Sequence, residues 1–241
     1  MCRMLLYVTK SEKAISREYI KEFVNIARYG LSAKCGLRPH GDGFGVAWVT
    51  ARGVGIYKSL NPIWEESIPV FPSLVTLIHA RKSSAGRIEI GNTHPFLINN
   101  IILAHNGTIY AFKRNPTKYE PMGKTDSEKF LSILAEIFDS YGDLLKAVLE
   151  AIMNVELATA LNIFSISLTK RRVIVVNLFY RVPKNCQLYY TLWLKREGDE
   201  IIISSEPLDR EDDWTALSTE PGRMTIVDIN LDEPEKLKIY R

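Results

Sequence analysis

Hydrophobic and polar positions follow two different periods in the first part of the chain. Residues 2–9 form an apolar run that ends at Lys10, which predicts a buried strand. Between residues 17 and 30 the apolar side chains recur at helical spacing, with Ser16 placed to cap the helix and Gly30 to end it. The chain is therefore expected to begin with a strand that is followed by a helix.

Short runs with strand character come after this helix. The runs 44–50 and 54–58 are separated by an Arg-Gly pair, which predicts a hairpin. Residues 74–79 and 101–105 are also rich in β-forming side chains, and each run ends in a polar loop that contains glycine. An irregular segment over 111–124 separates these strands from the middle of the chain.

Two helices are expected in the middle of the chain, at 126–140 and 143–158, because apolar side chains gather on one face of each. Only strands are predicted after them, at 161–169, 172–179, 187–195, 200–204 and 223–229. Strands on both sides of a helical pair indicate an α+β fold in which helices cover sheets, not the strict alternation of a doubly wound sheet. Without a repeat or a linker, residues 1–241 are interpreted as one domain.

Composition and charge narrow the classes of protein to which the chain can belong. Of its 241 residues 46% are hydrophobic and 24% are charged, as in ordinary globular domains. The net charge of +3, from 31 basic and 28 acidic side chains spread along the chain, argues against nucleic acid as the main partner. No apolar stretch approaches the roughly 20 residues of a membrane span, and the first residues become charged too early for a signal peptide. Three widely spaced cysteines, Cys2, Cys35 and Cys186, are expected to be reduced thiols, which favours a cytoplasmic protein.

Cys2 is the first candidate for chemistry. Removal of Met1 would give this residue both a thiol and a free α-amino group. A fraction of an α-amino group is neutral at pH 7, so an N-terminal cysteine carries its own base for nucleophilic catalysis. On its own, Cys2 is explained more simply as a buried cysteine in an edge strand.

Two strand ends carry the next candidates. The segment 79–86 is basic and rich in hydroxyl groups, so Arg81 can hold a carboxylate with two parallel hydrogen bonds and Ser84 can add a donor. Asn106 and Gly107 follow an apolar strand and offer an amide side chain and a backbone N–H, the composition of an oxyanion hole. Taken singly, the first pattern is also typical of a solvated turn and the second of a hairpin turn.

The beginning of the first central helix carries a third pattern. Thr125 and Glu128 have the spacing of a capping box, and Asp126 in the first turn suits the helix dipole. Capping accounts for Thr125 and Glu128 but does not require Asp126. Its carboxylate is therefore a candidate for holding a substrate ammonium group.

All the histidines lie between residues 40 and 105, and they are His40, His79, His94 and His105. They have neither HxH nor HxxxH spacing, and no acidic residue accompanies them in a ligand pattern. We therefore expect no metal and no other cofactor. The histidines are interpreted as core or loop residues whose ring nitrogens have partners.

The order of these candidates along the chain is more specific than any one of them. They fall within the motifs Met1-Cys2-Arg3, His40-Gly41-Asp42-Gly43-Phe44-Gly45-Val46-Ala47-Trp48, His79-Ala80-Arg81-Lys82-Ser83-Ser84-Ala85-Gly86, Asn92-Thr93-His94-Pro95-Phe96, His105-Asn106-Gly107 and Ile203-Ser204-Ser205-Glu206-Pro207-Leu208. Together these motifs resemble the glutaminase domain of class II glutamine amidotransferases, which are N-terminal nucleophile hydrolases. The chain is most similar to the stand-alone branch of the YafJ, Dug3 and EgtC type, from Cys2 to at least Trp214.

The resemblance implies a four-layer αββα sandwich of two mostly antiparallel sheets. It implies that Cys2 is the nucleophile, with its α-amine as the base, and that Asn106 and Gly107 form the oxyanion hole. The residues implied in substrate binding are Arg81 and Ser84 at the α-carboxylate, Asp126 at the α-ammonium, and His105. Further pocket residues are implied at His79, His94, Ser205 and Glu206.

The implied reaction is hydrolysis of a γ-glutamyl amide through a γ-glutamyl thioester, with release of ammonia or an amine. The substrate is then glutamine or another γ-glutamyl compound. Because the chain has no nucleotide-binding motif, a synthase or peptidase would be a separate subunit. Two alternatives remain open: a non-catalytic γ-glutamyl-ligand-binding or regulatory subunit on the same scaffold, and a metal-dependent hydrolase that uses the histidines.

Overall fold

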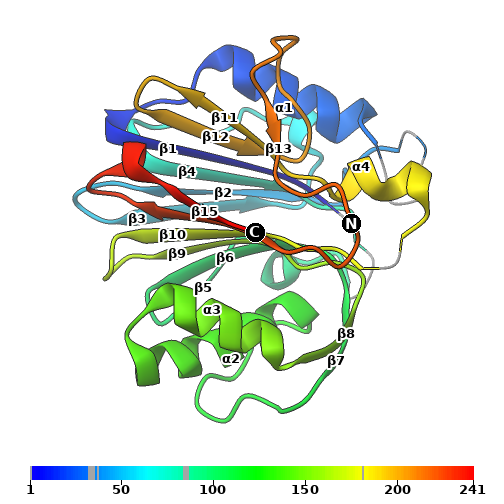
Figure 1. Ribbon diagram of the computed structural model, residues 1–241. Coiled ribbons are helices and arrows are strands. Elements are labelled where there is room, and N and C mark those ends of the chain that lie inside the picture. Colours follow the sequence, from blue (N-terminus) through cyan, green and yellow to red (C-terminus); the bar gives the residue numbers. More distant parts are fainter. Residues whose placement is uncertain (1, 32–35, 37, 84–86, 181) are drawn as a thin grey trace.

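Two antiparallel sheets lie face to face in the computed structural model, which describes residues 2–31, 36, 38–83, 87–180 and 182–241 (Figure 1). The first sheet contains β1 (Arg3–Lys13), β2 (Phe44–Val49), β3 (Val54–Ser59), β4 (Ser73–Ala80), β11 (Trp193–Glu197), β12 (Glu200–Ser204) and β13 (Thr215–Ala216). The second sheet contains β5 (Phe96–Ile98), β6 (Ile101–Asn106), β9 (Asn162–Ser167), β10 (Arg172–Asn177), β14 (Thr225–Asn230) and β15 (Lys238–Tyr240). A separate pair is formed by β7 (Ile109–Phe112) and β8 (Val155–Ala158).

The strand order places the beginning of the chain in the middle of the first sheet. This order is β13-β11-β12-β1-β4-β2-β3, and that of the second sheet is β15-β14-β10-β9-β6-β5. Residues 3–9 of β1 are buried, because β1 is covered on both faces and flanked by strands on both sides. That environment explains the continuous apolar run, since a strand buried on both faces has no polar face to alternate with.

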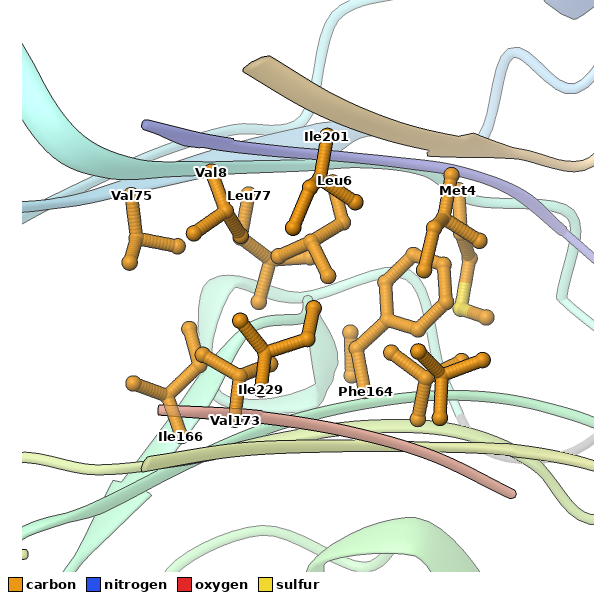
Figure 2. Close-up of a cluster of buried hydrophobic side chains, with 14 of the residues drawn as sticks. Met4, Leu6, Val8, Val75, Leu77, Phe164, Ile166, Val173, Ile201 and Ile229 are labelled. Atoms are coloured by element: carbon orange, nitrogen blue, oxygen red, sulfur yellow. The ribbon is translucent and has the colours of Figure 1, made fainter. Parts of the chain in front are cut away.

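The main core lies between the two sheets, where side chains from the two facing surfaces interdigitate (Figure 2). Met4, Leu6 and Val8 point from β1 toward the second sheet, which contributes Phe164 and Val173. The side chains of β1 between these positions enter the layer on the other face of the sheet. The core between the sheets therefore begins at Met4, two residues after Cys2.

Helices cover the outer faces of both sheets and complete the predicted four-layer αββα sandwich (Figure 1). The covering helices are α1 (Arg17–Tyr29) on the first sheet, and α2 (Asp126–Tyr141) and α3 (Leu144–Met153) on the second. Ser16 caps α1 as predicted, because its side chain accepts a hydrogen bond from the Tyr19 N–H. Within the part of the chain that the structure describes, no helix is long and apolar enough to cross a membrane.

Two predicted boundaries are wrong. The second central helix ends at Met153 instead of continuing to residue 158, and residues 155–158 form β8, which pairs with β7. The predicted strand 187–195 begins with the short helix α4 (Gln187–Tyr190), and strand geometry starts only at Trp193. Tyr189 and Tyr190 are aromatic and favour strands, but burying both rings on one side of the segment requires a helical turn.

Most of the elements that the hydrophobic pattern of the sequence did not predict are short strands. The strands β5, β7, β13 and β15 have two to four residues each, too few for a period to be read from the sequence. They lie at the edges of the two large sheets or in the separate pair. Their absence from the prediction therefore leaves the layer arrangement unchanged.

The cysteine prediction needs a correction. Cys2 is a free thiol, whereas Cys186 is disulfide-bonded, so the expectation of three reduced thiols is wrong for Cys186. Cys35 lies outside the described residues. Wide spacing along the sequence does not prevent the fold from bringing two thiols together, and the cysteine content therefore no longer supports a cytoplasmic protein.

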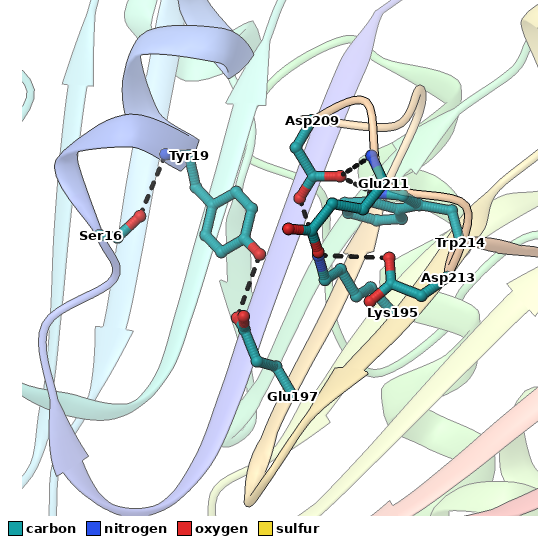
Figure 3. Close-up of polar contacts among 8 residues, drawn as sticks. All are labelled: Ser16, Tyr19, Lys195, Glu197, Asp209, Glu211, Asp213 and Trp214. Carbon is teal, nitrogen blue, oxygen red and sulfur yellow. Dashed lines mark hydrogen bonds and ion pairs between the residues drawn. The ribbon is translucent and has the colours of Figure 1, made fainter.

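A buried lysine fastens the segment 209–214 to the first sheet (Figure 3). The Lys195 ammonium group lies 2.9 Å from a carboxylate oxygen of Asp209, 2.6 Å from one of Glu211 and 3.2 Å from one of Asp213. The other carboxylate oxygen of Asp209 accepts a hydrogen bond from the Trp214 ring N–H at 2.8 Å. We call these five residues the Lys195 cluster.

Candidate active site

Cys2 lies at the beginning of the central strand β1 and is 7% exposed. Its backbone nitrogen donates a hydrogen bond to Asn106 Oδ1 at 2.8 Å, and its thiol sulfur accepts one from the Lys82 N–H at 3.4 Å. Its carbonyl oxygen accepts a hydrogen bond from the Tyr189 hydroxyl at 3.3 Å. β1 is not an edge strand, so the simpler explanation of Cys2 does not describe its position.

Asn106 is the last residue of β6, and Gly107 follows it directly. The pair is not a hairpin turn, because β6 lies in the second sheet whereas β7 pairs only with β8. The position of Gly107 requires glycine, since a Cβ atom there would overlap the carbonyl oxygen of Ala160. Asn106 Nδ2 is buried and makes no hydrogen bond to any described residue.

A small cavity beside Cys2 brings together side chains from distant parts of the sequence. It is lined by Cys2, Arg81, Lys82, Ser83, Asn92, His94, His105, Gly107, Thr125, Asp126 and Ser127. A larger cavity between α1 and residues 63–70 contains none of the predicted site residues. The smaller cavity thus holds the groups with candidate chemistry, and we call it the Cys2 cavity.

The loop after β4 places Arg81 in the Cys2 cavity. The side chain is 3% exposed, so the loop is not an ordinary solvated turn. Its guanidinium donates hydrogen bonds to the Arg87 carbonyl at 3.2 Å and to the Ser83 hydroxyl at 3.3 Å. Asp42 holds the loop by accepting hydrogen bonds from the Ser83 N–H at 2.9 Å and the Lys82 ammonium at 3.3 Å. Ser84 lies outside the described residues.

Asp126 begins α2 and faces the same cavity. One of its carboxylate oxygens accepts a hydrogen bond from the Ile109 N–H at 2.6 Å. Thr125 caps the helix by accepting from the Glu128 N–H at 3.2 Å, but the other half of the capping box does not form. The Glu128 carboxylate instead accepts from the backbone N–H groups of residues 122 and 123, because the preceding loop folds back over it.

Two histidines, His94 and His105, line the Cys2 cavity, and His79 stacks on His94 without lining it. The ring of His105 contacts the Ser127 hydroxyl at 2.9 Å through Nδ1 and the Ala160 carbonyl at 3.0 Å through Nε2. The rings of His79 and His94 stack with centroids 4.2 Å apart, and neither has a hydrogen-bond partner among the described residues. The expectation of satisfied histidines is therefore wrong for this pair.

Burial sets the charge of these histidines. It lowers the pKa of His79 to about 3 and holds the pKa of His94 well below its usual range. Burial also lowers the pKa of His105, although the carboxylate of Asp126 opposes this effect. All three rings are therefore neutral at pH 7.

Ser205 and Glu206 do not line the Cys2 cavity. The Ser205 hydroxyl accepts a hydrogen bond from the Met4 N–H at 2.9 Å. The Glu206 carboxylate forms an ion pair with the buried Arg3 and accepts from the Leu31 N–H at 3.0 Å. The structure thus places both residues behind Cys2, where they brace the first residues of β1.

Sequence reasoning gave no role to two residues that contact this site. Asn92 lines the cavity and accepts a hydrogen bond from the Lys124 N–H at 3.0 Å, and its place at the head of a motif was an available signal. Tyr189 falls within a predicted strand and outside every motif, so no feature of the sequence pointed to its contact with Cys2.

Comparisons with known proteins agree on one family. The family described as "Glutamine amidotransferases class-II" matches residues 14–166. A Haemophilus influenzae protein named "Putative glutamine amidotransferase" is 36% identical over 120 residues, which are 44% of this chain and 40% of that protein. The Saccharomyces cerevisiae "Probable glutamine amidotransferase DUG3" is 25% identical over 285 aligned positions, covering 91% of this chain and 80% of the yeast protein.

The fold is shared with a solved structure. Glutamine phosphoribosylpyrophosphate amidotransferase from Bacillus subtilis matches with a TM-score of 0.60 and 16% identity, over 100% of this chain and 49% of that chain. At this identity the likeness concerns the fold alone. The chain therefore spans about half of the Bacillus protein and less than half of the Haemophilus protein.

Proposed function

Because the chain belongs to the class II glutamine amidotransferases, we propose that it hydrolyses a γ-glutamyl amide bond with Cys2 as the nucleophile. One observation carries this proposal. A single cavity is lined by Cys2, Arg81, Gly107 and Asp126, which come from four separate segments of the chain. Each of the reactive and charged groups of a γ-glutamyl substrate thereby finds a partner of matching chemistry.

Recognition of the substrate follows from its charges. A γ-glutamyl group carries an α-carboxylate, an α-ammonium and a scissile carbonyl. The Arg81 guanidinium suits the α-carboxylate, and the Asp126 carboxylate suits the α-ammonium. His105 contacts Ser127 at the beginning of the same helix and supports the binding wall.

Stabilisation of the transition state falls to Asn106 and Gly107. The amide nitrogen Asn106 Nδ2 is a buried donor without a partner among the described residues, and a developing oxyanion supplies an acceptor. The other end of the same amide, Oδ1, already holds the backbone nitrogen of Cys2. Asn106 can thus orient the base and stabilise the oxyanion with one side chain.

The chemical steps require removal of Met1, which frees the α-amine of Cys2. The amine takes the thiol proton, directly or through a water, and the thiolate attacks the γ-carbonyl. Proton transfer to the leaving nitrogen releases ammonia or an amine and leaves a γ-glutamyl thioester. Water then hydrolyses the thioester, which yields glutamate and regenerates the thiol. Transfer of the ammonia to an acceptor would take place on a separate synthase or peptidase subunit.

The experiment that tests the proposal measures glutamate release from glutamine and from a panel of γ-glutamyl compounds. Intact mass must first show that Met1 is absent. We expect Cys2→Ala to lower release by at least about 10³-fold, because no other thiol faces the cavity among the described residues. The thermal unfolding midpoint should stay close to that of the wild type.

A chelator serves as the matched control, since thiol chemistry continues when divalent metals are removed. Release that persists in Cys2→Ala, or that stops with a chelator, would refute the proposed nucleophile. Absence of release from Met1-free protein with every compound of the panel would refute the proposal that this chain acts without a second subunit.

A further inference from the structure

Tyr189 holds the backbone of Cys2 from a distant part of the chain. It belongs to α4, and its hydroxyl donates a hydrogen bond to the Cys2 carbonyl oxygen at 3.3 Å. The family match ends at residue 166, and no motif of the sequence includes Tyr189. We infer that Tyr189 is a positioning residue that fixes the orientation of Cys2 for attack on the substrate. This inference rests on the proposed function.

The Tyr189 ring is held in place by its neighbours. It is 1% exposed, and the Arg3 guanidinium lies 4.7 Å from the ring centroid. The His40 ring stacks on it at 6.2 Å with an angle of 12° between the planes. Arg3 is itself fixed by its ion pair with Glu206. A ring enclosed in this way keeps its hydroxyl at one place beside Cys2.

The Tyr189 hydroxyl is neutral at pH 7 and can donate its proton. Burial raises the pKa of Tyr189 well above its usual value of 10, although the charge of Arg3 opposes this rise. A neutral phenol donates its proton to the Cys2 carbonyl, which is an acceptor only. The contact therefore requires no change in the protonation of Tyr189 at pH 7.

Orientation matters because removal of Met1 leaves Cys2 without a preceding peptide bond. The amine and thiol then turn together about the bond between the Cα and the carbonyl carbon of Cys2. Asn106 holds the nitrogen on one side of that bond, and Tyr189 holds the carbonyl oxygen on the other. Both contacts are needed to fix the rotation, and a misplacement of about 1 Å can lower a rate about 100-fold.

Two matched variants test the inference on Met1-free protein. Tyr189→Phe keeps the ring with its Arg3 and His40 contacts and removes only the hydroxyl. Tyr7→Phe is the control, because it also removes a fully buried hydroxyl, from the strand that follows Cys2, and no contact joins it to Cys2.

We expect kcat of Tyr189→Phe to fall about 10- to 100-fold while KM stays within about twofold, because Tyr189 does not line the substrate cavity. The unfolding midpoint should change as little as in the Tyr7→Phe control. A kcat within about twofold of wild type, or an equal loss in Tyr7→Phe, would overturn the inference.

A second readout is independent of catalysis. The rate at which iodoacetamide labels Cys2, followed by peptide mass spectrometry, should rise at least about threefold in Tyr189→Phe, because a released Cys2 leaves its buried position more often. If the wild type hydrolyses none of the compounds, the labelling rate alone tests whether Tyr189 positions Cys2. A rise in Tyr189→Phe alone would support positioning while the proposed function fails, and equal rates in all three proteins would overturn the positioning role.

Discussion

The surroundings of Cys2 and the Lys195 cluster both contain buried polar groups, but only in the Lys195 cluster does every buried side-chain nitrogen have a partner among the described residues. The Lys195 ammonium group has three carboxylate neighbours, and Asp209 also accepts from Trp214 (Figure 3). Burial alone would lower the pKa of Lys195, but the hydrogen bonds that its ammonium group donates to these carboxylates raise it. The ion is fully compensated before any ligand arrives.

Around Cys2, in contrast, several buried polar atoms have no hydrogen-bond partner among the described residues. Among the described residues, the buried side-chain nitrogen and oxygen atoms without a hydrogen-bond partner belong almost entirely to Arg3, His79, His94 and Asn106. The two exceptions are the hydroxyls of Tyr7 and Ser204. A buried donor without an acceptor costs about 1–3 kcal/mol. Of these four residues His94 lines the Cys2 cavity, and Asn106 contacts Cys2 directly.

The comparison separates two uses of buried polar groups. Buried groups that have partners within the protein, such as the Lys195 ammonium, hold one segment to another, and changing them should affect the stability of the fold alone. Buried groups without a hydrogen-bond partner, such as Asn106 Nδ2, lower the stability of the fold, and changing them should affect catalysis. The predictions below test this separation through catalysis or stability, from the largest expected effect to the smallest.

Asn106→Ala should have the largest effect. Loss of an oxyanion donor typically lowers kcat about 10²- to 10³-fold, and here the same change also releases the Cys2 nitrogen. Steady-state kinetics on Met1-free protein provide the measurement. Asn162→Ala, which removes a buried amide outside the cavity, serves as a control for folding. A kcat in Asn106→Ala within about tenfold of wild type would contradict the proposed role of the unpartnered Asn106 Nδ2 in catalysis.

Asp126→Asn should mainly weaken substrate binding. The change keeps the shape of the side chain and one acceptor for the Ile109 N–H, but it removes the negative charge that suits an α-ammonium. We expect KM to rise about 10- to 100-fold with a smaller change in kcat, since a charged hydrogen bond contributes about 1.5–3 kcal/mol. A substrate analogue that lacks the amino group should lose this sensitivity. Equal KM values in the two proteins would remove Asp126 from the site.

Acid should weaken the folded state through its buried histidines. Burial lowers the pKa values of His40 and His79 to about 3, against 6.5 for an unburied histidine. Between these values the unfolded chain binds more protons than the folded one. Stability is therefore complete above pH 6.5 and falls as the pH drops below it, by about 1.4 kcal/mol per pH unit for each such histidine.

Urea unfolding between pH 4.5 and 8 measures this slope. His79→Gln should remove the contribution of one histidine from the slope and leave the plateau above pH 7 in place. Burial opposes ionisation of Asp209 in the Lys195 cluster, but the hydrogen bonds that it accepts from Lys195 and Trp214 lower the pKa of its carboxyl, so this group titrates below the histidine window. A free energy of unfolding that stays constant from pH 7 to 5 would contradict the assigned burial.

Lys195→Met should have the smallest effect, and only on stability. Removing the ammonium group leaves three carboxylates facing one another, but Glu211 and Asp213 are 68% and 48% exposed and can turn toward water. We therefore expect the free energy of unfolding to fall by about 1–3 kcal/mol, less than for a fully buried pair. Lys236→Met, which breaks an exposed pair with Glu233, should change it by less than about 0.5 kcal/mol. A fall in kcat/KM of Lys195→Met would contradict the separation of the two clusters.

Periodicity predicted the layers of the fold because long elements repeat their pattern several times. The strand β1 and the helices α1 and α2 were recognisable from burial on one or both faces. The end of α3 and the nature of residues 187–190 were not, because tertiary contacts decide short segments. In these places a strand pairing or two buried aromatic rings outweigh local preference.

The sequence predicted those residues of the candidate site that belong to recognisable motifs. The order of Cys2, Arg81, Asn106 and Asp126 along the chain pointed to one cavity, and the structure brings their segments together. The contact between Cys2 and Tyr189 joins residues 187 positions apart and leaves no pattern in either segment. Contacts of this kind depend on how the layers stack, which no local sequence feature encodes.

The most direct test of the central claim is to trap the covalent intermediate on Cys2. Met1-free protein is mixed with glutamine or with the best compound of the γ-glutamyl panel, quenched in acid during turnover and analysed by peptide mass spectrometry. The account predicts a γ-glutamyl adduct on the peptide that contains Cys2, with no adduct in Cys2→Ala. Substrate turnover at an undiminished rate in Cys2→Ala, with no adduct on the wild-type peptide, would contradict it.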